Sequence, residues 1–512
     1  MIKLMRRSAL LLFSLWCSNN AIAASDIQLQ HWQRLLPSDA QVSLILAAPD
    51  GQRIVERNSH RLLLPASTQK LLTAVVASKV LGDEFQFRTS LLYRGEIKQH
   101  ELFGDVILRL DGDPRLTTEE LANLVAELAK AGIQRVRGDV IIAADTPAPK
   151  WAPGWLWDDL GVCFAAPVGK LILDQNCVKG ALSANPGQSS RVHLRYPLTI
   201  ENSASYEPST PDALCRLHLG HSQGNHYQLS GCYQVKNPLP LEIAIVDPAA
   251  YISEQLKRLW PRSVVLTGKI KVASIDLTSS KPLVSHPSMP LRPMIIEMLK
   301  KSDNLIADSL LKRVGEVTYG KYGFEYGAEA VKQTLASLGI GIKTANIVDG
   351  SGLSRYNQLT AEQLFQLLLL IQRDSSLQWL IKALPVAGLS GTLRYKRGYV
   401  NPQLQGIIWA KTGSMTGVDN LAGFIRIGED DSQLYPFVIM ENGISASSYH
   451  PKKFAPPFLK LARKQLEAAH TAQIAKLKQK AADDAKKNLN AVTAESNKAG
   501  TAIDTATGNR PK

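Results

Sequence analysis

The chain has 512 residues, of which 45% are hydrophobic and 20% are charged. This length allows roughly two to four domains, and the composition supports a folded core, which excludes a disordered or fibrous protein. Lysine and arginine outnumber aspartate and glutamate by 59 to 45, giving a net charge of +14. This moderate excess suits an anionic polymer or a membrane surface. No nucleic-acid-binding motif accompanies it, so we predict no nucleic-acid partner.

The first 24 residues are typical of a secretory signal peptide. Three basic residues precede an apolar run over residues 9–16, and Ala21-Ile22-Ala23 supplies a small-residue cleavage site. The apolar run is too short to span a bilayer. We therefore predict a protein exported to the periplasm, with residues 1–24 removed, and peripheral contact with the membrane stays open.

Four cysteines follow the signal peptide. An even number in an oxidising compartment indicates two disulfides, and the simplest connectivity pairs Cys163 with Cys177 and Cys215 with Cys232. The alternative is a metal site, because three histidines lie between Cys215 and Cys232. This cluster lacks paired metal-ligand spacing, so we favour the disulfides and predict neither a metal nor another cofactor.

The N-terminal part of the mature chain predicts two strands and a helix. Alternating apolar residues indicate strands over residues 42–46 and 53–55, joined by a turn at Pro49-Asp50-Gly51. A helix is predicted to begin near Pro65 and to continue, through apolar residues at helical spacing, to residue 80.

Residues 84–263 have a different pattern, with short strand-like runs such as residues 106–110 separated by Gly and Pro. We predict a separate, mainly β module there. Within it, Thr117 and Glu120 have the spacing of a capping box at the start of a helix. Three tryptophans over residues 151–157 suit a carbohydrate-stacking platform and a buried cluster equally well.

Helical and strand-like patterns return after this module. Apolar residues at helical spacing predict three helices, over residues 294–314, 328–338 and 361–371. Strand-like runs follow over residues 407–410 and 434–440, and a closing helix ends near residue 466. Residues 467–512 are rich in Ala, Lys, Asn and Thr, which predicts a disordered or solvated helical tail.

Ser67-Thr68-Gln69-Lys70 places a hydroxyl and an amine on one face of the first predicted helix. Lys70 can accept the Ser67 proton if burial or a nearby cation lowers its pKa. A second pair with this spacing, Ser309 and Lys312, falls inside a helical pattern. Ser67 instead lies near a helix start, where free N–H groups favour negative charge. We therefore predict Ser67 as the nucleophile and Lys70 as its base.

Ser302-Asp303-Asn304 and Lys411-Thr412-Gly413 make the signal specific. Fewer than about one random chain in a hundred contains both after the first motif. The three motifs together match those of serine penicillin-recognising enzymes. We predict that Ser302 relays a proton to the departing amine and that Asn304 holds both Lys70 and the substrate amide.

The last motif predicts a binding site for a substrate carboxylate. Lys411 supplies positive charge, which we also expect to lower the pKa of Lys70, and Thr412 donates a hydrogen bond to the carboxylate. Gly413 allows the substrate backbone to approach the strand edge. The backbone N–H groups of Ser67 and Ser414 are predicted to form the oxyanion hole.

Further stretches carry a resemblance to a known family. The chain over residues 25–466 resembles the D-alanyl-D-alanine carboxypeptidase/endopeptidase family of low-molecular-mass, class C penicillin-binding proteins. Cys163-Phe164-Ala165-Ala166-Pro167 resembles that family's inserted region. The other matching stretches are residues 302–308, 349–355, 384–393 and 410–414.

The resemblance implies an α/β (α+β) catalytic domain of the serine transpeptidase/β-lactamase type. Residues 25–83 and 264–466 would form it, and residues 84–263 would be inserted as one or two mainly β domains. The 234 residues between Ser67 and Ser302 independently require a large insertion, which an exposed loop tolerates at little cost in stability.

The resemblance also implies an activity. The substrates would be peptidoglycan peptides, cleaved through an acyl-enzyme at the D-Ala-D-Ala bond and at the cross-link between D-Ala and diaminopimelate, with β-lactams as covalent inhibitors. A β-lactamase is the nearest alternative, but no Glu-x-x-x-Asn segment after Ser302 supplies a hydrolytic carboxylate. A non-catalytic wall-binding or scaffold protein is the other alternative, and the intact motifs argue against it. The oligomeric state stays open.

Overall fold

The computed structural model describes residues 29–504 except 39, 145–149, 197, 212–213, 223, 235–237, 429–432 and 446–453. The predicted signal peptide, residues 1–24, lies outside the described residues. Within the described part of the chain, no helix combines the length and the apolar character that crossing a membrane requires.

A five-stranded antiparallel sheet joins the two ends of the folded chain, in the order β17-β18-β19-β1-β2. Gln41 of β1 lies opposite Asn442 of β19. The strands predicted near residues 42, 53, 407 and 434 are confirmed, whereas β18, with Asp, Asn and Gly in its sequence, was not predicted. The strands are β1 (Gln41–Ala47), β2 (Arg53–Arg57), β17 (Ile408–Met415), β18 (Val418–Arg426) and β19 (Leu434–Asn442).

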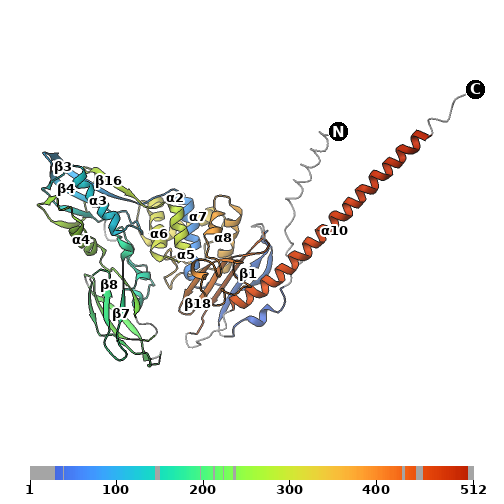
Figure 1. The fold of residues 1–512 in the computed structure, drawn as a ribbon, viewed down its shortest axis with the longest axis horizontal. Coiled ribbons are helices and arrows are strands. Elements are labelled where there is room, and N and C mark those ends of the chain that lie inside the picture. The colour runs from blue at the N-terminus through green and yellow to red at the C-terminus, as the bar shows by residue number, and fades with distance from the viewer. Residues whose placement is uncertain are drawn as a thin grey trace, which may run out of the picture.

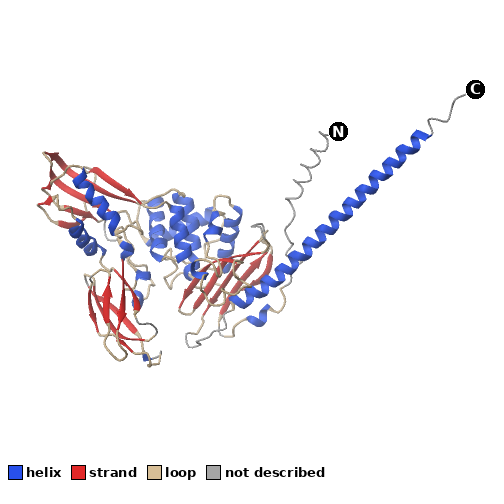
Figure 2. Ribbon diagram, in the orientation of Figure 1, coloured by secondary structure: helices blue, strands red, loops and turns tan. Residues whose placement is uncertain are grey.

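Helices cover one face of this sheet (Figures 1 and 2). The predicted helix over residues 294–314 is split at Ser302, whose backbone is left-handed (φ 60°, ψ 37°), and Asp303 caps the second half by accepting a hydrogen bond from Ile306 N at 2.9 Å. The covering elements are the 3₁₀ helix η3 (Ala66–Gln69) and α2 (Lys70–Leu81), α5 (Leu291–Lys301), α6 (Asn304–Tyr319), α7 (Phe324–Ser337), α8 (Ala361–Arg373) and α9 (Trp379–Ala383).

Strand periodicity divides the core of this domain into two layers. Ile45 on β1 faces the helices, and its neighbours Leu44 and Leu46 face the opposite side. There they meet Phe458 and Leu459 of α10 (Ala455–Asp504), so that the sheet is buried on both faces. The predicted closing helix and the tail beyond residue 466 therefore form one continuous helix through residue 504, rather than a disordered segment.

The insertion begins with a seven-stranded sheet that carries two helices. Thr117 and Glu120 form the predicted capping box at the start of α3, with Thr117 Oγ1 accepting a hydrogen bond from Glu120 N at 3.2 Å. The elements are β3 (Arg88–Lys98), β4 (Glu101–Arg109), α3 (Thr118–Lys130), β5 (Arg135–Val136), β6 (Val140–Ala143), α4 (Pro248–Leu259), β14 (Val265–Leu266), β15 (Ile270–Ala273) and β16 (Lys281–Pro287).

The C-terminal boundary of the insertion differs from the expected residue 263. Strands β14, β15 and β16 belong to the inserted sheet, and β16 pairs antiparallel with β3, so that Pro287 lies opposite Arg88. The sequence did not show this because these strands are short and follow a helix. Because β3 and β16 are paired, the chain enters the insertion and returns from it through two adjacent strands.

A second, smaller β domain completes the insertion (Figure 1). The predicted disulfides are both present. Cys163–Cys177 joins the segment that precedes β7 to the first residue of that strand, and Cys215–Cys232 lies within this domain. All four cysteines are therefore used in disulfides. The strands are β7 (Cys177–Ser183), β8 (Arg191–Leu194), β9 (Thr199–Asn202), β10 (Ser205–Tyr206), β11 (Leu217–Ser222), β12 (His226–Tyr233) and β13 (Leu239–Ala244).

The burial pattern of α10 predicts the effect of truncation. Leu466 is fully buried, whereas residues 474–491 are all exposed. Deleting residues 474–512 should change the free energy of unfolding by less than about 0.5 kcal/mol. Deleting residues 455–512 also removes Phe458 and Leu459 and should cost at least about 3 kcal/mol. Urea unfolding followed by tryptophan fluorescence measures both. Equal destabilisation by the two deletions would contradict this division of the helix.

Candidate active site

Ser67 and Lys70 meet at the start of the first helix. Ser67 lies in η3, directly after Ala66, whose backbone has a positive φ of 45°. Lys70 is the first residue of α2 and is fully buried, while Ser67 is half-buried. Lys70 Nζ lies 2.9 Å from Ser67 Oγ. The expected hydroxyl–amine pair is therefore formed, with its hydroxyl facing accessible space.

Two further acceptors hold the Lys70 amine. Lys70 Nζ donates to Asn304 Oδ1 at 2.7 Å and to the carbonyl oxygen of Ser351 at 2.7 Å. Burial lowers the pKa of Lys70, and the negative charges of Asp308 and Asp349 oppose that shift. Of the two predicted causes, burial and a nearby cation such as Lys411, burial is the one that acts on Lys70. The lowered pKa comes chiefly from desolvation, because Lys70 lies inside the core between α2 and α6.

Ser302 and Lys411 form the second pair of the site. The left-handed turn at Ser302, between α5 and α6, directs its hydroxyl to Lys411 Nζ at 2.9 Å. Lys411 lies on β17, is fully buried, and also donates to Thr412 O at 2.8 Å. Burial lowers the pKa of Lys411 well below its ordinary value, with smaller contributions from the charges of Lys70 and Lys396.

The rest of the Lys-Thr-Gly motif faces η3 and a neighbouring loop. Thr412 Oγ1 lies 2.8 Å from Thr392 Oγ1, a contact that sequence reasoning missed. A Cβ on Gly413 would lie 2.6 Å from Pro65 O and 3.1 Å from Thr68 N. Close packing of β17 on η3 therefore requires this glycine, in addition to any need of the substrate. Ser414, the next residue along β17, is exposed.

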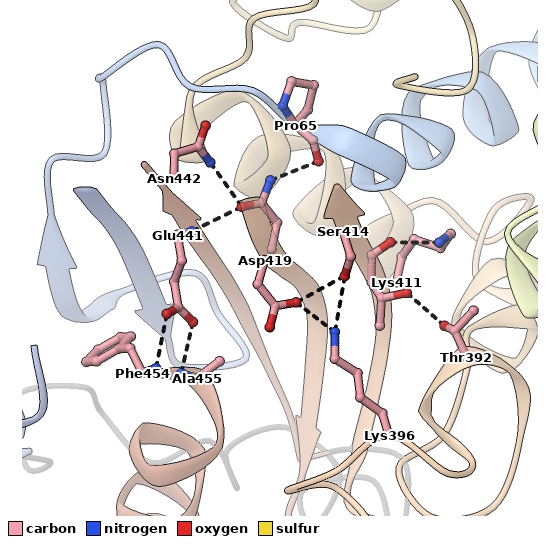
Figure 3. A network of polar contacts seen from close by, with 12 residues as sticks. Pro65, Thr392, Lys396, Lys411, Ser414, Asp419, Glu441, Asn442, Phe454 and Ala455 are labelled. Carbon is pink, nitrogen blue, oxygen red and sulfur yellow. Dashed lines mark hydrogen bonds and ion pairs between the residues drawn. The ribbon is translucent and has the colours of Figure 1, made fainter. Parts of the chain in front are cut away.

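A polar network beside Ser414 fixes the outer end of β17 (Figure 3). Lys396 Nζ contacts Asp419 Oδ1 at 2.7 Å and Ser414 Oγ at 3.3 Å, and Ser414 Oγ donates to the same carboxylate at 3.1 Å. Asp419 lies directly opposite Ser414 in the β17–β18 pair. Glu441 lies directly opposite Asp419 in the β18–β19 pair and accepts hydrogen bonds from Phe454 N and Ala455 N at the start of α10.

The inserted segment reaches the site. Asn304 Nδ2 donates to the carbonyl oxygen of Phe164, in the 3₁₀ helix η5 (Cys163–Ala165), at 2.8 Å. Trp155 Nε1 donates to Asp349 Oδ2 at 2.9 Å. Of the three tryptophans, Trp155 is thus a structural contact, whereas Trp157 is 84% exposed. The insertion is in this way part of the wall around Asn304.

The second Ser-x-x-Lys pair has a structural position. Ser309 and Lys312 are both fully buried inside α6. Lys312 Nζ donates to Val168 O of the inserted segment at 2.9 Å and lies 4.1 Å from the centre of the Phe324 ring. No described group of three or more His, Cys, Asp or Glu side chains could hold a metal ion. The clustered functional groups are those of the first pair and its neighbours.

The sheet, its helical face and the three motifs define a β-lactamase/transpeptidase-like fold of the penicillin-binding type, enlarged by inserted β domains. The model of the D-Ala-D-Ala carboxypeptidase 3 (S13) family matches residues 26–464, and the chain belongs to this family. This confirms the resemblance to the D-Ala-D-Ala carboxypeptidases.

Curated and solved relatives agree with this assignment. The chain is 33% identical to the D-alanyl-D-alanine carboxypeptidase DacB of Haemophilus influenzae over 453 residues, which are 86% of this chain and 93% of the relative. It is 28% identical to a D-alanyl-D-alanine carboxypeptidase of Actinomadura, over 78% and 77% of the two chains. The crystal structure of penicillin-binding protein 4 (dacB) from H. influenzae superposes with a TM-score of 0.77, covering 88% of this chain and 99% of that one at 32% identity.

The loop over residues 349–355, here called the site loop, packs tightly at Gly352 on η3, which carries Ser67. The φ of Gly352 is +79°, and an added Cβ would lie 1.9 Å from Ala66 O. Gly320, at the end of α6, has a φ of +69° and open space around it, which makes it a matched control. Gly320→Ala should cost about 1 kcal/mol for the backbone alone. Gly352→Ala should cost at least about 3 kcal/mol, because η3 must also move. Urea unfolding measures the difference, and equal costs would contradict the close approach.

Proposed function

We propose that this chain is an exported serine D,D-peptidase that cleaves the D-Ala-D-Ala bond of peptidoglycan stem peptides through an acyl-enzyme. The observation that carries the proposal is the 2.9 Å contact between Ser67 Oγ and the fully buried Lys70 amine. A serine hydroxyl is a weak nucleophile until a nearby base takes its proton, and a buried lysine with a lowered pKa supplies that base.

The three acceptors around Lys70 Nζ suit both protonation states. As an ammonium, Lys70 donates one hydrogen bond each to Ser67, Asn304 and Ser351. As a neutral amine, it keeps the bonds to Asn304 and Ser351, and its lone pair accepts the Ser67 proton. The amine therefore changes protonation state without changing its place, which favours proton transfer during the attack on the substrate carbonyl.

The Lys411 side of the site suits the free carboxylate of the terminal D-Ala. Lys411, Thr412 and Ser414 lie along β17, and Lys396 adds a second cation beside them. A bound carboxylate favours the protonated form of Lys411, and a charged Lys411 then favours the neutral form of Lys70. Substrate binding would in this way prepare the base.

The remaining steps use the same groups. The backbone N–H groups of Ser67 and Ser414 would stabilise the oxyanion of the tetrahedral intermediate, the predicted role of these two positions. The 2.9 Å contact between Lys411 Nζ and Ser302 Oγ provides a route for a proton to the departing amine. Water then hydrolyses the acyl-enzyme and regenerates Ser67.

The family resemblance also supports endopeptidase activity on the D-Ala–diaminopimelate cross-link, covalent binding of penicillin and a periplasmic location. A crystal structure of the H. influenzae penicillin-binding protein 4, 31% identical to this chain with a TM-score of 0.73, is a complex with a β-lactam. A β-lactamase would use the same motifs but release the acyl group rapidly.

Labelling with a fluorescent penicillin tests the nucleophile. The wild-type protein should form a covalent, slowly released adduct. Ser67→Ala should abolish it, because the attacking oxygen is lost, and Ser309→Ala should keep it, because Ser309 is fully buried inside α6, where a penicillin cannot reach it. Denaturing gels with fluorescence detection measure the adduct, and intact-mass spectrometry locates it.

Three other outcomes carry information in the same assay. Rapid release of the label favours a β-lactamase. Labelling that persists in Ser67→Ala contradicts the assignment of the nucleophile. If the wild type neither labels nor cleaves a D-Ala-D-Ala peptide, the wall-binding alternative takes first place. Chromatography of digested, cross-linked muropeptides then separates loss of terminal D-Ala from cleavage of the cross-link.

The protonation state of Lys70 predicts a pH dependence. Acylation needs the neutral amine, so its rate should rise as pH increases through the pKa of Lys70, which burial places below that of a solvated lysine. Lys70→Arg should lower the acylation rate about 10²- to 10⁴-fold, since a guanidinium keeps its proton. Stopped-flow acylation across pH measures both. If the slow acylation by Lys70→Arg still increases over the same pH range as that of the wild type, the group that titrates is not Lys70.

A further inference from the structure

Asp308 is a buried carboxyl group near Lys70 that none of the catalytic steps described above uses. It is on α6, four residues after Asn304, and therefore on the same face of that helix. Its side chain is fully buried. Asp308 Oδ1 accepts hydrogen bonds from the backbone N–H groups of Gly350 and Ser351, at 2.7 and 3.0 Å.

These two N–H groups directly precede the carbonyl group that holds the Lys70 amine. The carbonyl oxygen of Ser351 accepts from Lys70 Nζ at 2.7 Å, and that of Gly350 accepts from Thr73 Oγ1 at 2.7 Å. A Cβ on Gly350 would lie 2.6 Å from Ala307 O, so the loop also packs closely on α6. Asp308 is thus joined to the reacting amine through one residue, Ser351.

Burial and the neighbouring Asp349 raise the pKa of Asp308 to about 8, while the charge of Lys70 opposes that shift. Asp308 Oδ2 has no hydrogen-bond partner within the described part of the chain. The charged groups that act on this carboxyl group are Lys70 from α2, Lys312 from the next turn of α6 and Asp349 from the loop. The charge of Asp303, at the start of α6, also raises the pKa of Lys70. The charge of Asp308 in turn contributes to raising the pKa of Tyr322, which burial raises most.

We propose that Asp308 is a positioning residue for acyl transfer, which holds residues 350 and 351 so that the carbonyl oxygen of Ser351 keeps the Lys70 amine against Ser67. The inference deepens the proposed function and rests on it. The same carboxylate has an electrostatic effect. Burial lowers the pKa of Lys70, and the ionised form of Asp308 raises it, as does Asp349. Asp308 therefore affects both the place of the base and the pH at which it becomes neutral.

The two effects can be separated by substitution. Asp308→Asn keeps an oxygen that accepts both N–H groups but removes the charge. Its acylation rate at the optimal pH should stay within about tenfold of wild type, and the rise of rate with pH should move to lower pH, because Lys70 loses a neighbouring negative charge. Asp308→Glu keeps the charge but displaces the acceptor. Its rate should fall about 10²-fold with the rise left in place, since small displacements of catalytic groups cost that much.

The experiment is stopped-flow acylation by a fluorescent penicillin across pH, on the mature full-length protein. Each rate is normalised to the acylation-competent fraction, taken from the amplitude of labelling, so that loss of folded protein is not counted as loss of rate. Asp374→Asn is the matched control: this half-buried carboxylate pairs at 2.6 Å with Lys79, near the opposite end of α2 from Lys70, and its replacement should leave rate and pH profile unchanged.

Two results overturn the proposal. One is a wild-type rate and pH profile in both Asp308 variants. The other is a loss of activity explained entirely by a smaller competent fraction, which would make Asp308 a folding residue only. If Asp308→Asn fails to fold, Asp308→Glu still decides the positioning role, because it retains the buried charge. A wild-type protein that is never labelled overturns the proposed function together with this inference, whereas labelled wild type with unaffected variants overturns this inference alone.

Discussion

The site depends on one buried amine. An uncompensated charge inside a protein is very costly, so a lysine can be fully buried only where its donors are satisfied or where it loses its proton. Lys70 has both options, because three acceptors surround its Nζ: the Ser67 hydroxyl, the Asn304 amide and the Ser351 carbonyl group. These acceptors come from three segments that are far apart in the sequence. Helices α2 and α6 and the loop after residue 348 must all be in place before the amine is satisfied.

The insertion contributes to this arrangement rather than lying apart from it. Asn304 donates to Phe164 O with one group while it accepts from Lys70 with the other, and this fixes the orientation of its amide. Trp155 donates to Asp349, which in turn accepts from Gly352 N and Ser354 N within the site loop. The Cys163–Cys177 disulfide ties the segment that carries Phe164 to β7. The inserted domains therefore support the loop and the amide that hold the base.

Sequence reasoning located the side chains with a spacing or a motif and missed the groups without one. Ser67 and Lys70 could be found because residues three apart share a helix face. The Ser351 carbonyl group could not be found this way, because every residue has one. Asp308 lies within the stretch that carries the family resemblance, but its contact with residues 350 and 351 depends on tertiary packing. The Thr392–Thr412 contact is of the same kind.

The fold was predicted to a similar extent. The mainly β character of the insertion, the two disulfides and the α3 capping box were available from periodicity, cysteine count and turn signals, and the α/β domain followed from the family resemblance. The strands β14 to β16 were not, because two to seven residues following a helix carry little pattern of their own. Their place in the inserted sheet is set by pairing with β3, β5 and β6, about 130 to 200 residues earlier in the chain.

The pairing of β1 with β19 has a consequence for the order in which the molecule forms. Gln41 and Asn442 are partners across the sheet, so the strand made among the first must wait for one made among the last. The inserted domains have their own hydrophobic clusters and closer pairing partners, and can form during that interval. Until β19 arrives, β1 has apolar faces without partners. The chain is therefore most prone to aggregation through β1 in the interval before β19 pairs with it.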